Sequence, residues 1–527
     1  MKLTNIIKNL FGRKQDSEPE VYEYKEFIKK YVSRKVSENK EYLQKILKGG
    51  EDIIYREFSI GEKKQQLLLV YVDGMVDKTL LNEQILKSLM VDLRRSTYGE
   101  IVSIESVKNR CLSVSEIKEV ETFDKLVLGL LSGDTLVFMD GEPHGLVIGS
   151  KGWDSRGVAE PTTEKNVKGP KDCFVETLRS NTVLIRRRIR DPNLAIEMLE
   201  VGRRTKTDVA LVYLKGVIKE GLAEEVKQKI KKVDIDGIID SGQLEQLIAA
   251  KKWTIFPQTV STERPDKIVA GILEGRFAII VDGSPFVLLA PAGFADYLDA
   301  PDDYYENPMV TSILRITRYL SFFLSASLPG IYIAMVNLHP GMFPPKLVIS
   351  IVATRGALPF PTYIEMFIME SVLEVMQEAG IRLPQSIGQT VSIVGGIVIG
   401  QAAVEAGLVS PIVVIIVSLT AITSFTLPSY GLNLACRALR LPFMVAGATL
   451  GFFGIIAFSI MVLTHMASLD SFGVGYFEGF SPYRIGSLKD AIVQAPLSLM
   501  RSRPEFLKPQ DTQRQKSVKS SKEDGNE

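Results

Sequence analysis

The chain has 527 residues and a formal net charge of +1, so it is long enough for more than one folded unit and has no bulk attraction to nucleic acid. Its three cysteines, Cys111, Cys173 and Cys436, cannot all pair and show no CxxC spacing, which indicates a reducing compartment without structural disulfides. Charged residues crowd the part before Tyr319, and the part after it is largely apolar.

Residues 1–50 are predicted to form an N-terminal lead followed by one amphipathic helix. Residues 1–20 lack the apolar core of a secretory signal, so we expect the folded region that follows to remain in the cytoplasm. Apolar residues recur at helical spacing over residues 21–47, and Gly49 and Gly50 end this helix.

Two small α/β units are predicted next, at residues 51–155 and 165–290. In the first, the patterns predict strands at 52–60 and 66–72, helices at 79–90 and 124–131, and a hairpin of 134–139 with 144–148. In the second, they predict helices at 172–190, 222–231, 244–249 and 268–273, strands at 195–203, 207–214 and 234–239, and a hairpin of 277–282 with 285–289. Alternating strands and helices favour an α/β over an all-α architecture.

A basic run closes the first helix of the second unit, at Arg186, Arg187, Arg188 and Arg190. The run is short and has no interleaved aromatic residues, so it is a weak signal for nucleic-acid binding. The structural alternatives are a solvated helix end or a salt-bridged face between the two units, and we favour these and expect no nucleic-acid partner.

Residues 291–318 are predicted to be an interfacial linker. Phe294, Tyr297, Tyr304 and Tyr305 lie there among aspartates, which suits either a bilayer interface or an ordinary linker with packed tyrosines. Arg315 and Arg318 follow, and basic residues at the end of a membrane span favour its cytoplasmic side.

Residues 319–466 are predicted to be a transmembrane domain, with spans near 319–338, 387–407, 411–428 and 443–466. Each has roughly the 20 apolar residues that a helix needs to cross a bilayer. The only basic residues in this region are Lys346, Arg355, Arg382, Arg437 and Arg440. The predicted fold class is therefore an α/β cytoplasmic head of two small subdomains followed by an all-α transmembrane bundle.

Residues 346–379 interrupt this pattern. Prolines in the sequence LPFP at 358–361 break the segment, and Glu370, Glu374 and Glu378 then line up along one face of a helix. We favour a re-entrant or surface-lying segment beside four full spans; a fifth crossing would move the C-terminus to the other side of the membrane. Residues 467–500 are predicted to be a membrane-proximal segment, and the polar residues 501–527 a disordered tail.

Two pairs of glycines are spaced for close helix packing. Gly396 and Gly400 are four residues apart in the second predicted span, and Gly447 and Gly451 repeat the spacing in the fourth. Small residues at this spacing let helix backbones approach closely, although glycine is also simply tolerated in membrane helices.

No enzyme signature is present. His144, His339 and His465 are scattered without metal-ligand spacing, and neither a phosphate-binding loop nor a nucleophile elbow occurs. We predict that the protein is not an enzyme and carries no cofactor and no metal.

The acidic stripe of Glu370, Glu374 and Glu378 is the best functional candidate from the residues alone. Carboxylates among membrane segments usually line a cavity or an ion path, and repeated around an oligomer they form rings that attract cations. The alternative is the solvent face of an amphipathic helix on the membrane surface.

Long stretches of the sequence resemble the A subunits of the GerA family of spore germinant receptors. These stretches are LRSNTVLIRRRIRDPNL at 178–194, GRRTKTDVALVYL at 202–214, STERPDKIVAGILEGRFAIIVDGSPFVLLAP at 261–291, PDDYYENP at 301–308 and residues 358–411 from LPFPTYIEMF to AGLVSP. The likeness extends over almost the whole chain, from about residue 50 to residue 480.

The resemblance implies a multi-pass protein of the spore inner membrane, acting when small nutrients trigger ion release and germination. It implies two partners, a transporter-like integral membrane subunit and a lipoprotein subunit, besides membrane lipid and other copies of the chain in an ion-conducting oligomer. It adds Glu365 to Glu370 and Glu374 as an ion-path candidate. A membrane-anchored scaffold, or the family's paralogue associated with the dipicolinate channel, remains as the alternative.

Overall fold

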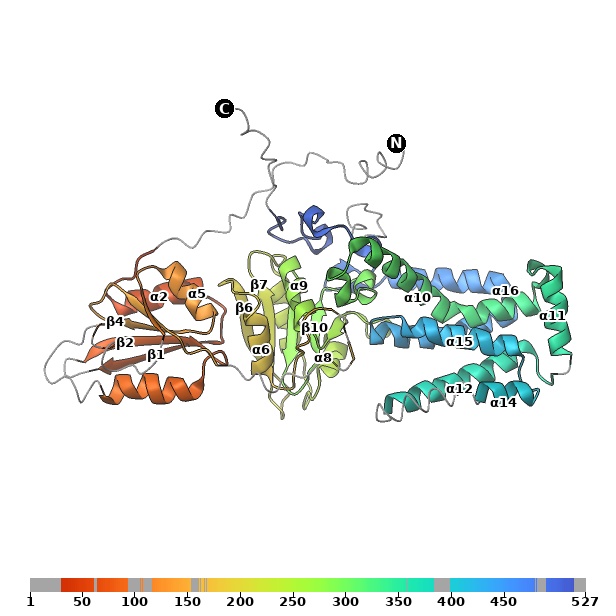
Figure 1. Ribbon diagram of the computed structural model, residues 1–527, viewed down its shortest axis with the longest axis horizontal. Coiled ribbons are helices and arrows are strands. Elements are labelled where there is room, and N and C mark those ends of the chain that lie inside the picture. Colours follow the sequence, from red (N-terminus) through yellow and green to blue (C-terminus); the bar gives the residue numbers. More distant parts are fainter. Residues whose placement is uncertain are drawn as a thin grey trace, which may run out of the picture.

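The computed structural model contains three parts that follow one another along its long axis, two α/β units and a helical half (Figure 1). The structure describes residues 30–60, 64–92, 105, 107, 116–152, 161, 163–164, 166, 168–356, 358–382, 399–478, 480 and 490–515. The prediction of an α/β architecture for the N-terminal half is confirmed.

The first unit is built on a five-stranded antiparallel sheet of order β1-β2-β4-β5-β3. Its strands are β1 (Ile53–Ile60), β2 (Gln65–Val72), β3 (Ile117–Val120), β4 (Thr135–Met139) and β5 (Gly145–Ile148). The helices α2 (Val36–Ile46) and α5 (Phe123–Leu131) pack on one face, and the π-helices η1 (Leu80–Leu86) and η2 (Ser88–Asp92) contribute to the core on the other. Strand β2 is buried on both faces, which explains its nearly continuous apolar sequence.

The second unit repeats this strand order as β6-β7-β9-β10-β8. Its strands are β6 (Leu194–Val201), β7 (Thr207–Leu214), β8 (Val260–Thr262), β9 (Phe277–Val281) and β10 (Val287–Ala290). The helices α6 (Leu178–Arg186) and α9 (Pro265–Glu274) pack on one face, and α7 (Leu222–Lys231) and α8 (Ser241–Ile248) pack on the other.

Matching hydrogen bonds show that the two units are structural repeats of each other. Asn39 on α2 accepts a bond from the Ser33 amide, and Asn181 on α6 accepts one from the Val175 amide, both at 2.8 Å and from six residues earlier. The first amide of each helix donates to an aspartate that lies 104 residues later in the sequence. Val36 donates to Asp140, and Leu178 donates to Asp282. The chain therefore contains an internal duplication that composition and periodicity did not reveal.

Two predicted elements of the second unit differ in the structure, and one strand was not predicted. Helix α6 is shorter than the predicted 172–190, because the Phe174 amide donates to the Glu263 carbonyl and holds residues before Leu178 out of the helix. The predicted strand 234–239 does not form; its carbonyls accept bonds from the turn after β6. Strand β8 was not predicted, because only three residues of it pair with β10.

Arg186 joins the two α/β units. Its guanidinium, 1% exposed, donates two bonds to the Asp52 carboxylate, at 3.0 and 2.7 Å. Beside it, Gly50 forms a parallel bridge with Ile196 at the edge of β6. The basic run was predicted to be either a solvated helix end or a salt-bridged face between the two units. For Arg186, the structure shows the salt-bridged face.

The helical half contains α10 (Pro308–Asn337), α11 (Pro345–Arg355), α12 (Thr362–Arg382), α14 (Gly400–Glu405), α15 (Pro411–Phe425) and α16 (Tyr430–Ala467). Among the described residues, α10 and α16 are long and apolar enough to cross a membrane by length and composition. Residues 383–398, which hold most of the predicted second span, lie outside the described residues. Helix α12 packs among the others through Met366 and Met369 rather than lying apart from them.

Helix α16 is a hairpin of two antiparallel arms, not the single span predicted at 443–466. Gly451 leaves the helical conformation with φ of 61°, and the rings of Phe443 and Phe458, on opposite sides of it, lie 4.8 Å apart. A straight helix would separate these rings by about 22 Å. Both ends of the hairpin lie at the second α/β unit, where Gly431 packs near Pro257 and His465 contacts Thr254.

The C-terminal segment returns to the second unit. It contains β11 (Asp470–Ser471), β12 (Val474–Gly475), η8 (Leu497–Leu499) and η9 (Glu505–Leu507). The predicted disorder is wrong for residues 501–515: Arg503 donates to the Leu273 carbonyl at 2.7 Å, and the Gln510 amide donates to the Val217 carbonyl at 3.1 Å. Hydrogen bonds to carbonyls of α9 and of the turn after β7 order this polar segment, and composition does not report such contacts.

We predict that Asp52→Asn destabilises the protein by about 3 to 5 kcal/mol, because it leaves the buried Arg186 charge without its partner. Unfolding by guanidinium, followed by circular dichroism, measures the loss. The double variant Asp52→Asn, Arg186→Met should recover part of it. Arg203→Ala breaks an ion pair with Asp234 whose side chains are both 65% exposed, and it should leave stability unchanged. Equal losses in Asp52→Asn and Arg203→Ala would contradict the interface role of Arg186.

Candidate functional site

Each of the four predicted glutamates lies on α12, and each faces an arginine. The pairs are Glu365 with Arg355 at 3.5 Å, Glu370 with Arg440 at 3.4 Å, Glu374 with Arg437, and Glu378 with Arg382 at 2.6 Å. The arginines come from α11, from the first arm of α16 and from α12 itself. The acidic stripe is therefore neutralised, pair by pair, within one copy of the chain.

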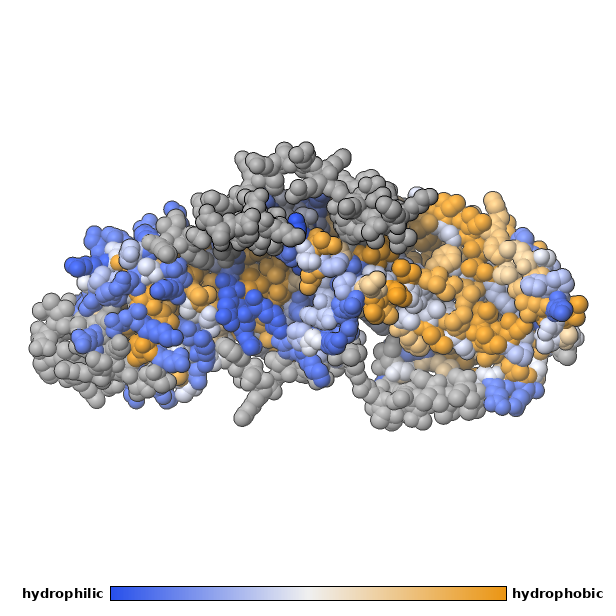
Figure 2. All heavy atoms as spheres, turned by 45° about the horizontal axis from the view of Figure 1, so that its top comes forward, coloured by the Kyte–Doolittle hydropathy of each residue, from blue (hydrophilic) through white to orange (hydrophobic). Residues whose placement is uncertain are grey.

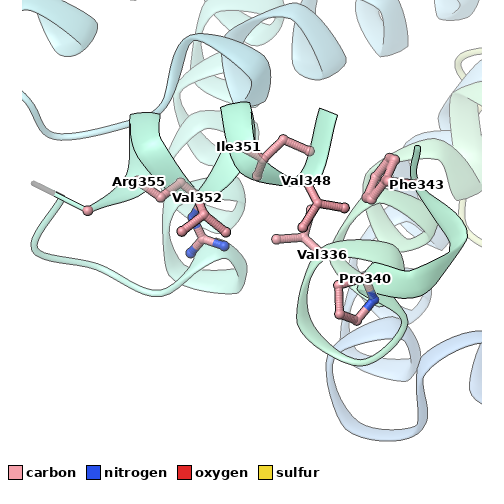
Figure 3. Close-up of a pocket in the computed structure, with 8 residues that line it drawn as sticks. Val336, Pro340, Phe343, Val348, Ile351, Val352 and Arg355 are labelled. Atoms are coloured by element: carbon pink, nitrogen blue, oxygen red, sulfur yellow. The ribbon is translucent and has the colours of Figure 1, made fainter. Parts of the chain in front are cut away.

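Glu365 is fully buried and has a second source of positive potential. Its Oε2 accepts a bond of 2.9 Å from the amide of Ser410, the residue that caps the start of α15. The N-terminus of a helix carries a partial positive charge that favours an anion. Its partner Arg355 ends α11, beside the apolar side chains of Ile351 and Val352, where a cavity of about 260 Å³ opens (Figure 3).

Glu370 and Arg440 form a buried pair that joins three helices. Arg440 is 4% exposed, and its Nε also donates to the Ser325 carbonyl of α10 at 2.8 Å. One guanidinium thus connects α10, α12 and α16. Removing either charge would leave the other buried without a counter-charge, which is costly.

Exposure rises toward the end of α12. Glu374 is 52% exposed, although its partner Arg437 is 8% exposed. Glu378 and Arg382 are both exposed and lie one turn apart on the same helix, where such a pair contributes little. The structure therefore brings Glu365, Glu370 and Glu374 to neighbouring helices and leaves Glu378 at the surface.

The predicted packing glycines fall into three situations. A Cβ on Gly447 would lie 2.3 Å from the Gly330 carbonyl oxygen, so α10 and α16 touch there backbone to backbone. Gly451 forms the hairpin turn instead. A Cβ on Gly400, the first residue of α14, would contact Val414 at 3.3 Å. Gly396 lies outside the described residues.

A second charged cluster, at the junction of the head and the helical half, was not predicted. Arg315 of α10 is fully buried and lies 3.1 to 3.2 Å from the carboxylates of Asp303, Asp299 and Asp490. Arg318, one turn further, donates two bonds to Asp303. The sequence signal was available: arginines one turn apart follow a run of aspartates. The aromatic side chains of this linker are mostly packed, with Tyr297 1% exposed, as in the ordinary-linker alternative.

A cavity of about 280 Å³ lies beside this cluster and is lined by Glu274, Arg276, Asp296, Asp299 and Arg514. Arg276 donates to both oxygens of Asp296. Glu274 lies 3.7 Å from Arg276 and 3.7 Å from Arg514. Burial raises the pKa of the Glu274 carboxyl to about 7, and the two arginines oppose that shift. Burial also raises the pKa of Asp299 and of Asp490.

The raised pKa of Glu274 predicts a pH-dependent stability. The folded state binds the proton of the Glu274 carboxyl more tightly than the unfolded chain, in which the pKa of this group is near 4.5. The protonated carboxyl therefore adds to the free energy of unfolding below pH 4.5, and this stabilisation is lost as the pH rises through 7. Relative to Glu274→Gln, the wild type should lose about 2 to 3 kcal/mol between pH 4.5 and pH 8. Denaturant unfolding at the two pH values measures this. Glu225→Gln, at the exposed face of α7, should show no such difference, and a pH-independent gap for Glu274→Gln would refute the assignment.

Comparisons with known proteins agree on one family. The family model of the Bacillus/Clostridium GerA spore germination protein matches residues 41–506. The spore germination protein KA of Bacillus subtilis (strain 168) is 40% identical over 485 residues, which cover 92% of this chain and 89% of that protein. The spore germination protein B1 of the same organism is 37% identical over 490 residues, 92% of this chain and 100% of that protein.

A solved structure is also similar. It is the N-terminal domain of the A subunit of the Bacillus megaterium spore germinant receptor GerK3, which is 32% identical, covers 50% of this chain and 98% of that domain, and has a TM-score of 0.41. The family match runs through both α/β units and the whole helical half, including the charged positions on α12. The chain belongs to the GerA family of spore germination proteins.

Proposed function

We propose that this chain is the A-type subunit of a nutrient germinant receptor in the spore inner membrane. In this proposal several copies form an ion-conducting oligomer, and the α/β head couples nutrient sensing to ion release. A transporter-like integral membrane subunit and a lipoprotein subunit are its partners. The family membership and the spore germination proteins among the relatives support the first step.

The distribution of apolar side chains supports a membrane location for the helical half. Apolar residues dominate its visible surface, whereas hydrophilic residues gather over the α/β units (Figure 2). Three apolar side chains of α16 are 58 to 72% exposed, namely Phe453, Ile460 and Met461. Exposure of so much neighbouring apolar surface to water is unfavourable. Because the chain enters and leaves the helical half beside the second α/β unit, the head and the C-terminal segment lie on one side, and we assign that side to the cytoplasm.

The single observation that carries the channel proposal is the buried Glu370–Arg440 pair. Ionised side chains at membrane depth are tolerated when paired and mark functional paths. In the resting arrangement each α12 carboxylate is held by an arginine, so the path is closed electrostatically. Conduction requires the pairs to separate, so that carboxylates from several copies can face one aqueous pore.

A continuous series of contacts leads from the head to this pair. Asp299 and Asp303 of the linker bind Arg315 and Arg318 on α10. About 15 Å further along the same helix, the Ser325 carbonyl accepts the bond from Arg440, which holds Glu370. A displacement of the head relative to α10 would therefore reach α12 through the two ionic contacts at the linker, the hydrogen bond of Ser325 with Arg440 and the Arg440–Glu370 pair.

We predict that Glu370→Gln alters ion flux and Glu378→Gln does not. The first substitution leaves Arg440 buried without a counter-charge and destabilises the closed arrangement by about 3 to 5 kcal/mol; the second breaks only an exposed pair. Currents through the reconstituted chain in planar bilayers measure the difference, with a higher basal cation conductance expected for Glu370→Gln. Glu370→Gln combined with Arg440→Met should return the basal current toward that of the wild type.

Intact oligomers that conduct no ions in any of these variants would instead favour a membrane-anchored scaffold. Spores that carry Glu370→Gln in place of the wild type provide the physiological test. They should show altered nutrient-induced germination, whereas spores with Glu378→Gln should respond normally.

A further inference from the structure

A hydrogen-bonded loop of the second α/β unit, residues 251–256, lies against the end of the α16 hairpin. The side chain of Gln258 brackets the loop by accepting from the Lys251 amide at 3.1 Å and donating to the Lys251 carbonyl at 2.5 Å. Lys251 Nζ donates to the Ser468 carbonyl at 2.7 Å, and the Thr254 hydroxyl lies 3.0 Å from His465 Nε2. These bonds fix the loop to the second arm of α16.

The loop presents its largest apolar side chain to the outside. Trp253 is 96% exposed and Ile255 is 47% exposed, while Phe256 turns inward and is 3% exposed. Lys252, next to Trp253, is also exposed. A fixed loop that holds an indole away from its own protein is typical of a contact surface, because free solvation of so much apolar area is unfavourable.

Between this loop and α16 lies an apolar hollow of about 520 Å³. Leu439, Phe458, Met461 and Val462 line it from the two arms of the hairpin, and Trp253 and Lys252 line it from the loop. The hollow continues into the exposed apolar surface of the second arm, where Ile456 and Ile460 are 57 and 59% exposed. Among the described residues that line the hollow, Lys252 is the only lysine or arginine, His465 is the other basic side chain, and there is no carboxylate.

We propose that this hollow binds an anionic phospholipid. An acyl chain occupies the apolar hollow, the Trp253 indole lies at the level of the headgroups, and Lys252 contacts the phosphate. Tryptophan and lysine are the residues that favour this zone of a bilayer. The continuity of the hollow with the α16 surface selects lipid over a soluble partner; in this respect the inference depends on the proposed membrane location of α16.

Depth-resolved quenching tests the proposal. The chain has two tryptophans, so full-length protein with Trp153→Phe reports on Trp253 alone. This variant is placed in nanodiscs of phosphatidylcholine with phosphatidylglycerol brominated either near the headgroup end of its chains or at their far end. We expect strong quenching of Trp253 by the shallow bromines, weak quenching by the deep ones, and little by aqueous iodide.

A second reporter separates this inference from the proposed function. Ile456→Trp, in a Trp153→Phe, Trp253→Phe background, should be quenched by bromolipid if α16 lies in the bilayer. Quenching of this reporter together with free access of iodide to Trp253 would overturn the lipid site alone. Absence of bromolipid quenching at both positions would overturn the membrane location as well.

The charge of the headgroup is tested with lysine variants. Lys252→Gln should weaken the preference of the Trp253 contact for phosphatidylglycerol over phosphatidylcholine by about fivefold, the contribution of one lysine near an anionic surface. Lys231→Gln, at the exposed end of α7, should leave the preference unchanged. Equal behaviour of the two variants would show that the contact does not depend on the anionic headgroup.

Discussion

The buried guanidinium of Arg315 is the contact on which the assembly of head and helices depends. An arginine can be removed from water only if carboxylates surround it, and here they come from two distant parts of the chain: Asp299 and Asp303 precede α10, and Asp490 follows the last helix. The Arg315 side chain thus holds both the linker and the C-terminal segment against α10. Three aspartates of this cluster face two arginines, Arg315 and Arg318. Burial raises the pKa of Asp299 and of Asp490, which opposes their ionisation, so the attraction to the arginines only slightly exceeds the cost of burying the charges.

Compensation of charge also organises the interior of the helical half. After α10, each described arginine of this half pairs with a glutamate of α12. The two most buried of these acids, Glu365 and Glu370, contact different neighbouring helices. Helix α12 is therefore positioned by ionic contacts as much as by its apolar side. The structure shows the paired arrangement, and the conducting state proposed above requires a second one in which these pairs have separated.

The sequence was sufficient for features that depend on local pattern. Periodicity located most strands and helices of the head, and the spacing of Glu370, Glu374 and Glu378 placed them on one helix. Features that depend on distant partners were not predictable. The residues around Gly451 look like the middle of one long apolar helix, because glycine is common in such helices. The backbone angle of Gly451 and the contact of Phe443 with Phe458 reveal the turn. Residues 234–239 have the apolar content of a strand but find no neighbouring strand, and the polar residues 501–515 are ordered by carbonyls of another unit.

The reversal at Gly451 determines at which end of the helical half the chain emerges. If α16 were straight, it would be a rod of about 57 Å, far longer than the hydrocarbon layer is thick. It would emerge on the face opposite the head, and Asp490 could no longer reach Arg315. A positive backbone angle that only glycine adopts readily thus decides whether the C-terminal segment returns to the side of the head, where it can contact the first helix.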